Sequence, residues 1–268
     1  MSMQSYLNEQ VTIFQSSLYQ TTSTVIETQT AVFVIDPNWL PIEVEKIQTF
    51  VENCRQGKKL FLIFTHSDFD HILGANAFEG AIVISTQELK DHPKKQNILQ
   101  EIKDFDSSYY LERPYSVSFP EVDIVVQEDG ETLEEDEVTL SFFKAPGHTH
   151  DGLITVIEPL GVLVAGDYLS DVEFPFIFDS VSSYIKTLHT FEYIINQYEI
   201  KVLVPGHGNP TNDLDSIQYR IDTSKKYVQG LLNNEPLVEW LKQEYPFYEG
   251  MKEEHEQNIK KVKEENYC

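Results

Sequence analysis

Residues 60–71, LFLIFTHSDFDH, begin with an apolar run and end with a dense polar cluster. A short apolar run bounded by polar residues predicts a strand that is buried on both faces. The cluster that follows contains two histidines and two aspartates: His66, Asp68, Asp70 and His71. In an extended or looping backbone, positions 66, 68 and 70 share a face while position 71 points elsewhere. One segment is therefore expected to supply ligands to two adjacent metal ions.

Three later segments repeat this arrangement of an apolar strand followed by a short polar turn. FFKAPG precedes His148, VLVAG precedes Asp167 and VLVPG precedes His207. Strand ends hold functional side chains well, because the strand fixes the backbone while the turn leaves the side chain free to face a ligand. Imidazole and carboxylate ligands suit Zn²⁺, Fe²⁺ or Mn²⁺, and the absence of cysteine from the cluster argues against a closed structural zinc site.

Taken together, these segments resemble the metallo-β-lactamase superfamily. The first is similar to the family signature H-x-H-x-D-H, in the variant form H-x-D-x-D-H, and the three later residues follow in the family's order. The resemblance runs from the N-terminal strands to about residue 210. It implies an α/β fold of four layers, αββα, in which two mixed β-sheets are flanked by helices and the metals lie at one sheet edge.

The resemblance also implies two sets of metal ligands. One ion would be bound by His66, Asp68 and His148, the other by Asp70, His71 and His207, and Asp167 would bridge them. The expected cofactors are two divalent ions, with Zn²⁺ as the first choice and Fe²⁺ or Mn²⁺ as alternatives. Asp70 is the expected catalytic residue, because it would also orient the attacking hydroxide.

Position 68 departs from the family pattern, because an aspartate stands where the signature has its second histidine. Three carboxylates and a hydroxide would balance the charge of two divalent ions, whereas a histidine here would leave one positive charge in excess. We therefore expect a less electrophilic metal pair, a less acidic bound water and better tolerance of Fe²⁺ or Mn²⁺.

The expected activity is hydrolysis of a small ester, thioester or lactone, as in glyoxalase II-like or lactonase-like relatives. Bound metals lower the pKa of water from about 15.7 toward ~7, which makes hydroxide available at neutral pH. Three alternatives remain open. They are a diiron redox protein similar to the flavodiiron proteins, a phosphodiesterase, and a non-catalytic regulatory protein that binds metal.

Composition restricts the partners of the protein. A net charge of −24 with no basic patch argues against nucleic acid and anionic membranes, so a small-molecule substrate is expected. The apolar runs are far too short to span a bilayer. The N-terminus resembles no secretory signal and the two cysteines, Cys54 and Cys268, form no disulfide framework, so the expected location is the cytoplasm.

The order of predicted elements favours one metallo-β-lactamase-like domain over residues 1–250 and a charged, helical tail over residues 251–268. Three antiparallel strands are expected in residues 10–35, and helices in residues 42–54, 182–198 and most of 213–233. The aromatic stripe from Trp240 to Tyr248 fits either the core or a homodimer contact. Asp36 is expected to form a turn or cap, with a contact to a metal ligand as the alternative. His150 is expected to be an ordinary loop residue or a substrate contact, and His255 is expected at the surface.

Overall fold

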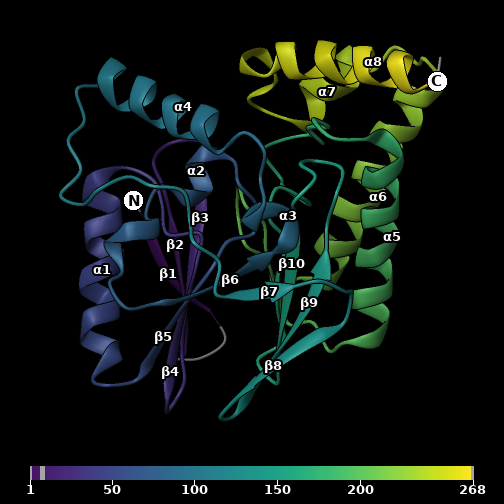
Figure 1. Ribbon diagram of the computed structural model, residues 1–268. Helices are drawn as coiled ribbons and strands as arrows, with labels where there is room; N and C mark the ends of the chain where they lie inside the picture. The colour runs from purple at the N-terminus through teal and green to yellow at the C-terminus, as the bar shows by residue number, and fades with distance from the viewer. Residues whose placement is uncertain (1, 7–9, 267–268) are drawn as a thin grey trace.

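Two β-sheets packed face to face form the centre of the molecule (Figure 1), in a computed structural model that describes residues 2–6 and 10–266. The first sheet has the spatial order β1 to β7. Its strands are β1 (Ser2–Tyr6), β2 (Val11–Gln15), β3 (Thr22–Glu27), β4 (Ala31–Ile35), β5 (Lys59–Ile63), β6 (Ile82–Thr86) and β7 (Ile124–Val126). Neighbours from β1 to β4 are antiparallel, and those from β4 to β7 are parallel, so the sheet is mixed.

The second sheet is also mixed and has the order β12-β11-β10-β9-β8. Its strands are β8 (Glu131–Glu135), β9 (Val138–Lys144), β10 (Leu153–Glu158), β11 (Val162–Val164) and β12 (Val202–Val204). Only β11 and β12 run parallel among the pairs of this sheet, and the others are antiparallel. A parallel pair places the carboxyl ends of both strands at the same edge.

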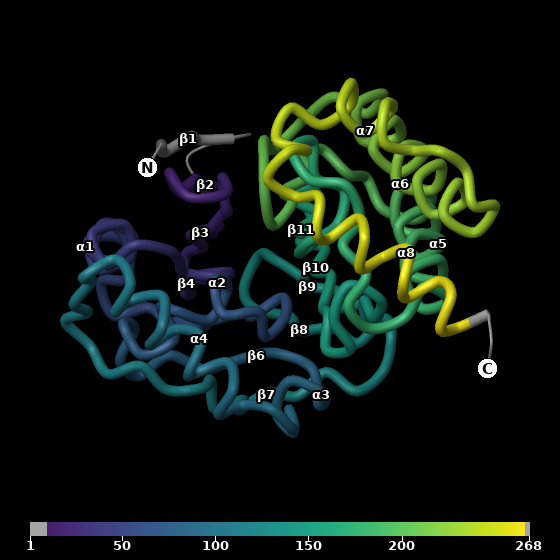
Figure 2. Tube along the Cα trace, turned by 90° about the horizontal axis from the view of Figure 1, so that it is seen from above, coloured from purple at the N-terminus to yellow at the C-terminus, as the bar shows by residue number. Residues whose placement is uncertain are grey.

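Helices cover the outer faces of both sheets, which gives the four-layer αββα sandwich (Figure 2). The α-helices are α1 (Pro41–Arg55), α2 (Phe69–Ile72), α3 (Gln87–Lys90), α4 (Lys95–Ser108), α5 (Val181–Gln197), α6 (Leu214–Leu232), α7 (Val238–Glu244) and α8 (Lys252–Asn266). Two 3₁₀ turns, η1 (Ala75–Ala77) and η2 (Tyr248–Gly250), complete the elements. α1 and α4 lie beyond the first sheet, and α5 and α6 lie beyond the second. The predicted fold class is confirmed.

Strand β5 shows why a continuous apolar sequence is needed at the centre of this fold. Leu60 and Leu62 face the helices outside the first sheet, while Phe61 and Ile63 face the second sheet. The Phe61 ring stacks on Phe33 of the neighbouring strand with centroids 4.9 Å apart. Both faces of β5 are therefore buried, as the apolar run predicts.

The C-terminal helices pack against α5 and α6. Tyr245 and Tyr248 are buried in the same hydrophobic core as those two helices. The surface position expected for His255 is wrong, because His255 is only 5% exposed. It occupies the face of α8 that turns inward, while most of the charged residues of the helix are exposed on the other faces. The division into residues 1–250 and 251–268 stays a prediction.

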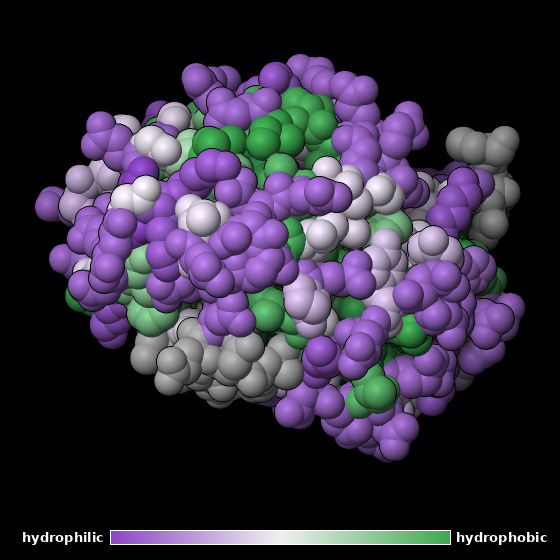
Figure 3. Space-filling model, turned by 90° about the horizontal axis from the view of Figure 1, so that it is seen from below, coloured by the Kyte–Doolittle hydropathy of each residue, from purple (hydrophilic) through white to green (hydrophobic). Residues whose placement is uncertain are grey.

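None of the helices in the described residues has both the length and the apolar character needed to cross a bilayer. The face of the molecule in Figure 3 is largely hydrophilic, with separate hydrophobic patches between the hydrophilic side chains. This agrees with the acidic composition. Cys54 is a free thiol, and Cys268 lies outside the described residues.

Candidate metal centre

The polar clusters that follow the apolar strands meet at one edge of the two sheets. The turn after β5 leads directly into α2, whose first turn contains Asp70 and His71. The second sheet is tied to this edge by a hydrogen bond of 2.6 Å from Leu153 N to Thr65 O. Another, of 2.7 Å, joins Thr22 N to Gly206 O beyond the end of β12. Backbone pairing between the sheets thus brings distant segments together.

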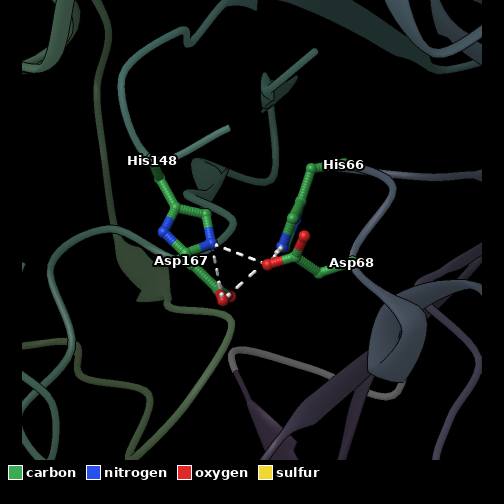
Figure 4. A group of neighbouring side chains, drawn as sticks. All are labelled: His66, Asp68, His148 and Asp167. Carbon is green, nitrogen blue, oxygen red and sulfur yellow. Dashed lines mark hydrogen bonds and ion pairs between the residues drawn. The ribbon is translucent and has the colours of Figure 1, made fainter. Parts of the chain in front are cut away.

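The first group consists of His66, Asp68 and His148, with Asp167 beside them (Figure 4). His148 Nε2 lies 3.2 Å from Asp68 Oδ2 and 3.3 Å from Asp167 Oδ2. His66 Nε2 lies 3.7 Å from Asp68 Oδ2 and 3.5 Å from Asp167 Oδ2. The ligand atoms of these four residues all lie within 4.8 Å of one another, which is close enough for one ion to contact them together.

The second group consists of Asp70, His71 and His207. Asp70 Oδ2 lies 3.4 Å from His71 Nε2 and 3.3 Å from His207 Nε2. Asp167 also contacts this group, at 3.1 Å from His71 Nε2 and 3.2 Å from His207 Nε2. Asp167 therefore lies between the two groups and contacts both. All seven residues proposed from the sequence lie together.

Each of the four imidazoles is fixed through its Nδ1 atom. The acceptors are Thr65 Oγ1 for His66 at 3.0 Å, Asp36 Oδ2 for His71 at 2.9 Å, Phe176 O for His148 at 2.9 Å and Tyr19 O for His207 at 3.0 Å. The Thr65 hydroxyl donates to Asp36, so it accepts from His66. With Nδ1 donating, the Nε2 lone pair of every imidazole faces the centre of the cluster, as a metal ligand requires.

Buried polar atoms at the centre test whether the cluster fits a cation. His66 Nε2 and Asp167 Oδ1 are buried without a hydrogen-bond partner, and a buried polar group in that state is costly unless something else contacts it. Gly206 gives Asp167 its space, because a Cβ at this position would lie 2.0 Å from Asp167 Oδ1. The histidine and aspartate cluster fits a divalent cation and suggests metal binding.

The side chains of the cluster shift one another's pKa strongly. Burial would lower the pKa of His148, but its hydrogen bonds to Asp167 and Asp68 outweigh burial and raise the pKa to about 10. Burial would raise the pKa of Asp68, yet the hydrogen bonds from His148 and His66 hold it well below its usual range. The carboxylates that favour a proton on these imidazoles equally favour a divalent cation among them.

A cavity of about 550 Å³ opens beside the first group. Asp68 lines it, and the Asp68 side chain is 34% exposed, whereas the other six cluster side chains are at most 11% exposed. His150 also lines the cavity, and its ring lies 4.8 Å from that of His92. The cavity gives a small molecule access to the first group from the Asp68 side.

Two further acids, Asp36 and Glu173, contact histidines of the cluster. Asp36 contacts both His71 and Thr65, so the alternative for Asp36, a contact to a proposed metal ligand, is the one that the structure shows. Asp36 follows a buried apolar strand, as Asp167 does, and that shared signal would have favoured this role. Glu173 lies 3.8 Å from His207 Nδ1, and burial raises its pKa to about 7. No pattern in the sequence pointed to Glu173.

Comparison with known proteins identifies the family. A family model described as the metallo-beta-lactamase superfamily matches residues 17–207. The chain belongs to this superfamily. The matched stretch ends at His207, the last of the seven cluster residues. No curated protein matches the chain by sequence.

Solved structures of the metallo-β-lactamase superfamily share the fold at low sequence identity. A metallo-beta-lactamase from Pontibacter korlensis superposes with a TM-score of 0.58 at 16% identity, covering 84% of this chain and 99% of that one. A metallo-beta-lactamase family protein from Thermus thermophilus gives 0.62 at 18% identity, covering 85% and 82%. A double mutant of the sec-alkyl sulfatase PisA1 gives 0.68 at 13% identity, covering 88% of this chain and 43% of that one. At these identities the likeness concerns the fold alone.

Proposed function

We propose that this protein is a dinuclear metal-dependent hydrolase that cleaves a small ester, thioester or lactone. One observation carries the proposal: four Nε2 atoms and three carboxylates converge in two groups that share Asp167. His66, Asp68 and His148 would hold one ion, and Asp70, His71 and His207 the other. Divalent ions bound there would supply Lewis acidity and lower the pKa of a water molecule.

The protein's own residues would place the reactants. Asp70 is 8% exposed and lies against both His71 and His207, and its carboxylate would accept a hydrogen bond from the attacking water. The substrate would enter through the cavity that Asp68 lines, with its reacting carbonyl directed at the cluster. His150 would contact the part of the substrate that stays in the cavity.

The substrate class rests on size and charge. A cavity of about 550 Å³ suits a small molecule rather than a polymer. The net charge of −24 disfavours polyanions such as RNA and DNA. Zn²⁺ is the favoured metal, and the carboxylate at position 68 favours Fe²⁺ or Mn²⁺ as the alternatives.

Elemental analysis followed by a substrate panel tests the proposal. The protein is purified without chelators, its metal content is measured, and the chelated protein is assayed with each ion restored. The panel contains an ester, a thioester, a lactone and a phosphodiester, together with a sulfate ester and a β-lactam because structural relatives carry those names. Turnover of a carbonyl substrate that requires metal, and that Asp70→Asn reduces by ~100-fold or more, supports the proposal. Asp91→Asn, at an exposed position, is the control and should leave turnover unchanged.

A second variant tests the metal preference. Asp68→His restores the family's signature and adds one positive charge to the loaded cluster. We expect it to raise the share of zinc over iron and manganese in protein from the same medium. Identical metal content in Asp68→His and the native protein would contradict the proposed role of Asp68.

A diiron redox protein is the second candidate, and Asp68 is the observation that favours it, since an additional carboxylate ligand suits iron. An absorption band in the visible range with iron bound, together with consumption of oxygen or nitric oxide, would support it. Stoichiometric metal without any turnover on the panel would favour a regulatory protein instead.

A further inference from the structure

Helix α8 lies beyond the residues that the family model matches, yet it contacts a loop of the metal centre. This loop, residues 173–180, connects the Asp167 segment to α5 and contains Phe176. Figures 1 and 2 show α8 crossing the upper end of the second sheet beside α5 and α6. Because Phe176 O accepts the hydrogen bond from His148 Nδ1, the loop fixes the orientation of a proposed metal ligand.

Asn258 of α8 holds both neighbours of Phe176. Its Oδ1 accepts a hydrogen bond of 2.9 Å from Ile177 N, and its Nδ2 donates one of 2.6 Å to Pro175 O. In a parallel sheet, a residue of one strand donates to the carbonyl before its partner residue and accepts from the N–H after it. Asn258 makes the same two hydrogen bonds on either side of Phe176. The amide of one side chain thus replaces a missing strand and holds the backbone around Phe176.

The surroundings of Asn258 keep this amide in one orientation. Asn258 is fully buried, and Nδ2 also lies 3.0 Å from the Tyr227 hydroxyl oxygen. The same hydroxyl oxygen lies 2.9 Å from His255 Nδ1, and a phenol oxygen has the lone pairs to accept from the amide as well. The contacts fix which end of the amide donates and which accepts.

Two further residues of α8 hold the end of the same loop. Lys261 Nζ donates to Asp179 O at 3.2 Å, and Glu265 Oε1 accepts from Val181 N at 2.8 Å. Positions 258, 261 and 265 are three and four residues apart, which places their side chains on one face of the helix. One face of α8 therefore holds the loop and the first residue of α5 at three successive points, from Pro175 to Val181.

We propose that Asn258 is a positioning residue for the first group of the metal centre, acting through the Pro175–Ile177 backbone and the Phe176 carbonyl on His148. The inference rests on the part of the proposed function that places a cation at His148. The proposal adds to the metal centre a helix, α8, that contains none of the seven cluster residues. The predicted consequence is a specific weakening of one metal site when Asn258 loses its amide.

Metal binding to Asn258→Ala tests this inference. Zn²⁺ affinity is measured by competition with a chromophoric chelator, and the Co²⁺ absorption spectrum reports on ligand geometry. We expect one of the two ions to bind ~10-fold more weakly, within the range found for partners of metal-bound histidines, while the other keeps its affinity. The Co²⁺ spectrum should change in intensity or position.

Two variants of α8 separate positioning from general destabilisation. Gln257→Ala removes a neighbouring exposed amide and should change neither affinity. Val262→Ala removes buried apolar contacts from the inward face of α8, so it should lower the melting temperature without weakening the ion at His148. Equal loss of affinity in Val262→Ala and Asn258→Ala, at equal loss of thermal stability, would overturn the proposal.

A double-mutant comparison locates the effect. In a His148→Ala background, Asn258→Ala should cause no further loss of metal affinity, since its target is already absent. A further loss as large as that in the native background would overturn the pathway through His148. If Asn258→Ala does not fold, Glu265→Ala takes its place with a smaller expected loss at the same ion, and unchanged affinity there would count against the proposal.

Failure of the inference and failure of the hydrolase proposal give different results. Native protein that binds two ions and responds to Asn258→Ala as expected, but turns over no substrate, supports the positioning role and contradicts the proposed activity. Metal-dependent turnover by the native protein, together with unchanged metal affinities in Asn258→Ala, supports the proposed activity and contradicts the positioning role. Native protein that binds no divalent ion contradicts both.

Discussion

The two halves of the metal centre differ in how they are supported. In the second group, His71 is fixed by the carboxylate of Asp36, which follows β4. The backbone of β4 is itself held by pairing with β3 on one side and β5 on the other. In the first group, His148 is fixed by a main-chain carbonyl in a loop that depends on α8. The first group is also more exposed to solvent, because it contains Asp68, the most exposed side chain of the seven. The group that faces the cavity thus contains the histidine, His148, whose support depends on a helix outside the residues that the family model matches.

Loss of the shared ligand should erase the difference between the groups. Asp167→Asn removes the negative charge that contacts all four imidazoles, so both ions should be lost together. We expect affinity to fall by more than the ~100-fold upper range for outer partners, because a ligand itself is changed. Elemental analysis after dialysis measures it, with the exposed Asp136→Asn as control. Retention of one full equivalent of metal would contradict a bridging role.

Adding a methyl group beside Asp167 should have the next largest effect on metal binding. Gly206→Ala places a Cβ 2.0 Å from Asp167 Oδ1, so the carboxylate or the backbone must move. We expect a destabilisation of about 1–3 kcal/mol together with weaker binding of both ions. Urea unfolding, with and without metal, measures the two effects. Gly250→Ala is the matched control, because its Cβ would have no atom within 4 Å.

Asp36→Asn should weaken the second group more than the first, because Asp36 contacts His71 directly and His66 only through the Thr65 hydroxyl. The variant replaces a charged acceptor of the His71 Nδ1 hydrogen bond with a neutral amide. The affinity of the second ion should fall by ~10- to 100-fold, as for other partners of metal-bound histidines. Chelator competition measures it. Asp123→Asn is the control, since Asp123 accepts a hydrogen bond from Val83 N near a strand end far along the same sheet. Equal weakening of both ions would mean that the two groups are not separately supported.

The smallest expected effect concerns pH and the support of the first group. Burial lowers the pKa of His255, and the nearby Glu256 opposes this only in part. His255 faces the hydroxyl of Tyr227 and the ring of Tyr248. Below about pH 6.5 the unfolded chain takes up a proton on His255 more readily than the folded chain does. The free energy of unfolding should therefore decrease as the pH is lowered, until the folded imidazole is protonated as well. Above that pH His255 contributes no pH dependence.

Urea midpoints of the native protein and His255→Gln at several pH values measure this contribution. The difference between the two proteins isolates His255, because every other titrating group is common to both. A difference that does not vary between pH 7.5 and pH 5 would contradict the prediction.

The sequence predicted the central strands and the seven cluster residues because both carry local signals. Leu60 to Phe64 is apolar at every position, as burial on both faces requires, and each polar cluster follows such a strand. The surface position predicted for His255 was wrong because most of its neighbours in sequence are charged. The average composition of a segment does not reveal that one face of its helix is buried. Glu173 and Asn258 carry no signal, since their partners are backbone atoms or residues distant along the chain.

What the sequence alone determined is the buried strands, the polar clusters that follow them and, through the resemblance that these clusters carry, the layered fold, because apolar periodicity and residue chemistry act locally. What only the tertiary structure decided is the distances between those side chains, the lone-pair direction of each imidazole, and the dependence of His148 on α8. These features arise from hydrogen bonds between segments far apart in the chain. Such bonds depend on how the layers pack, and no short stretch of sequence encodes that packing.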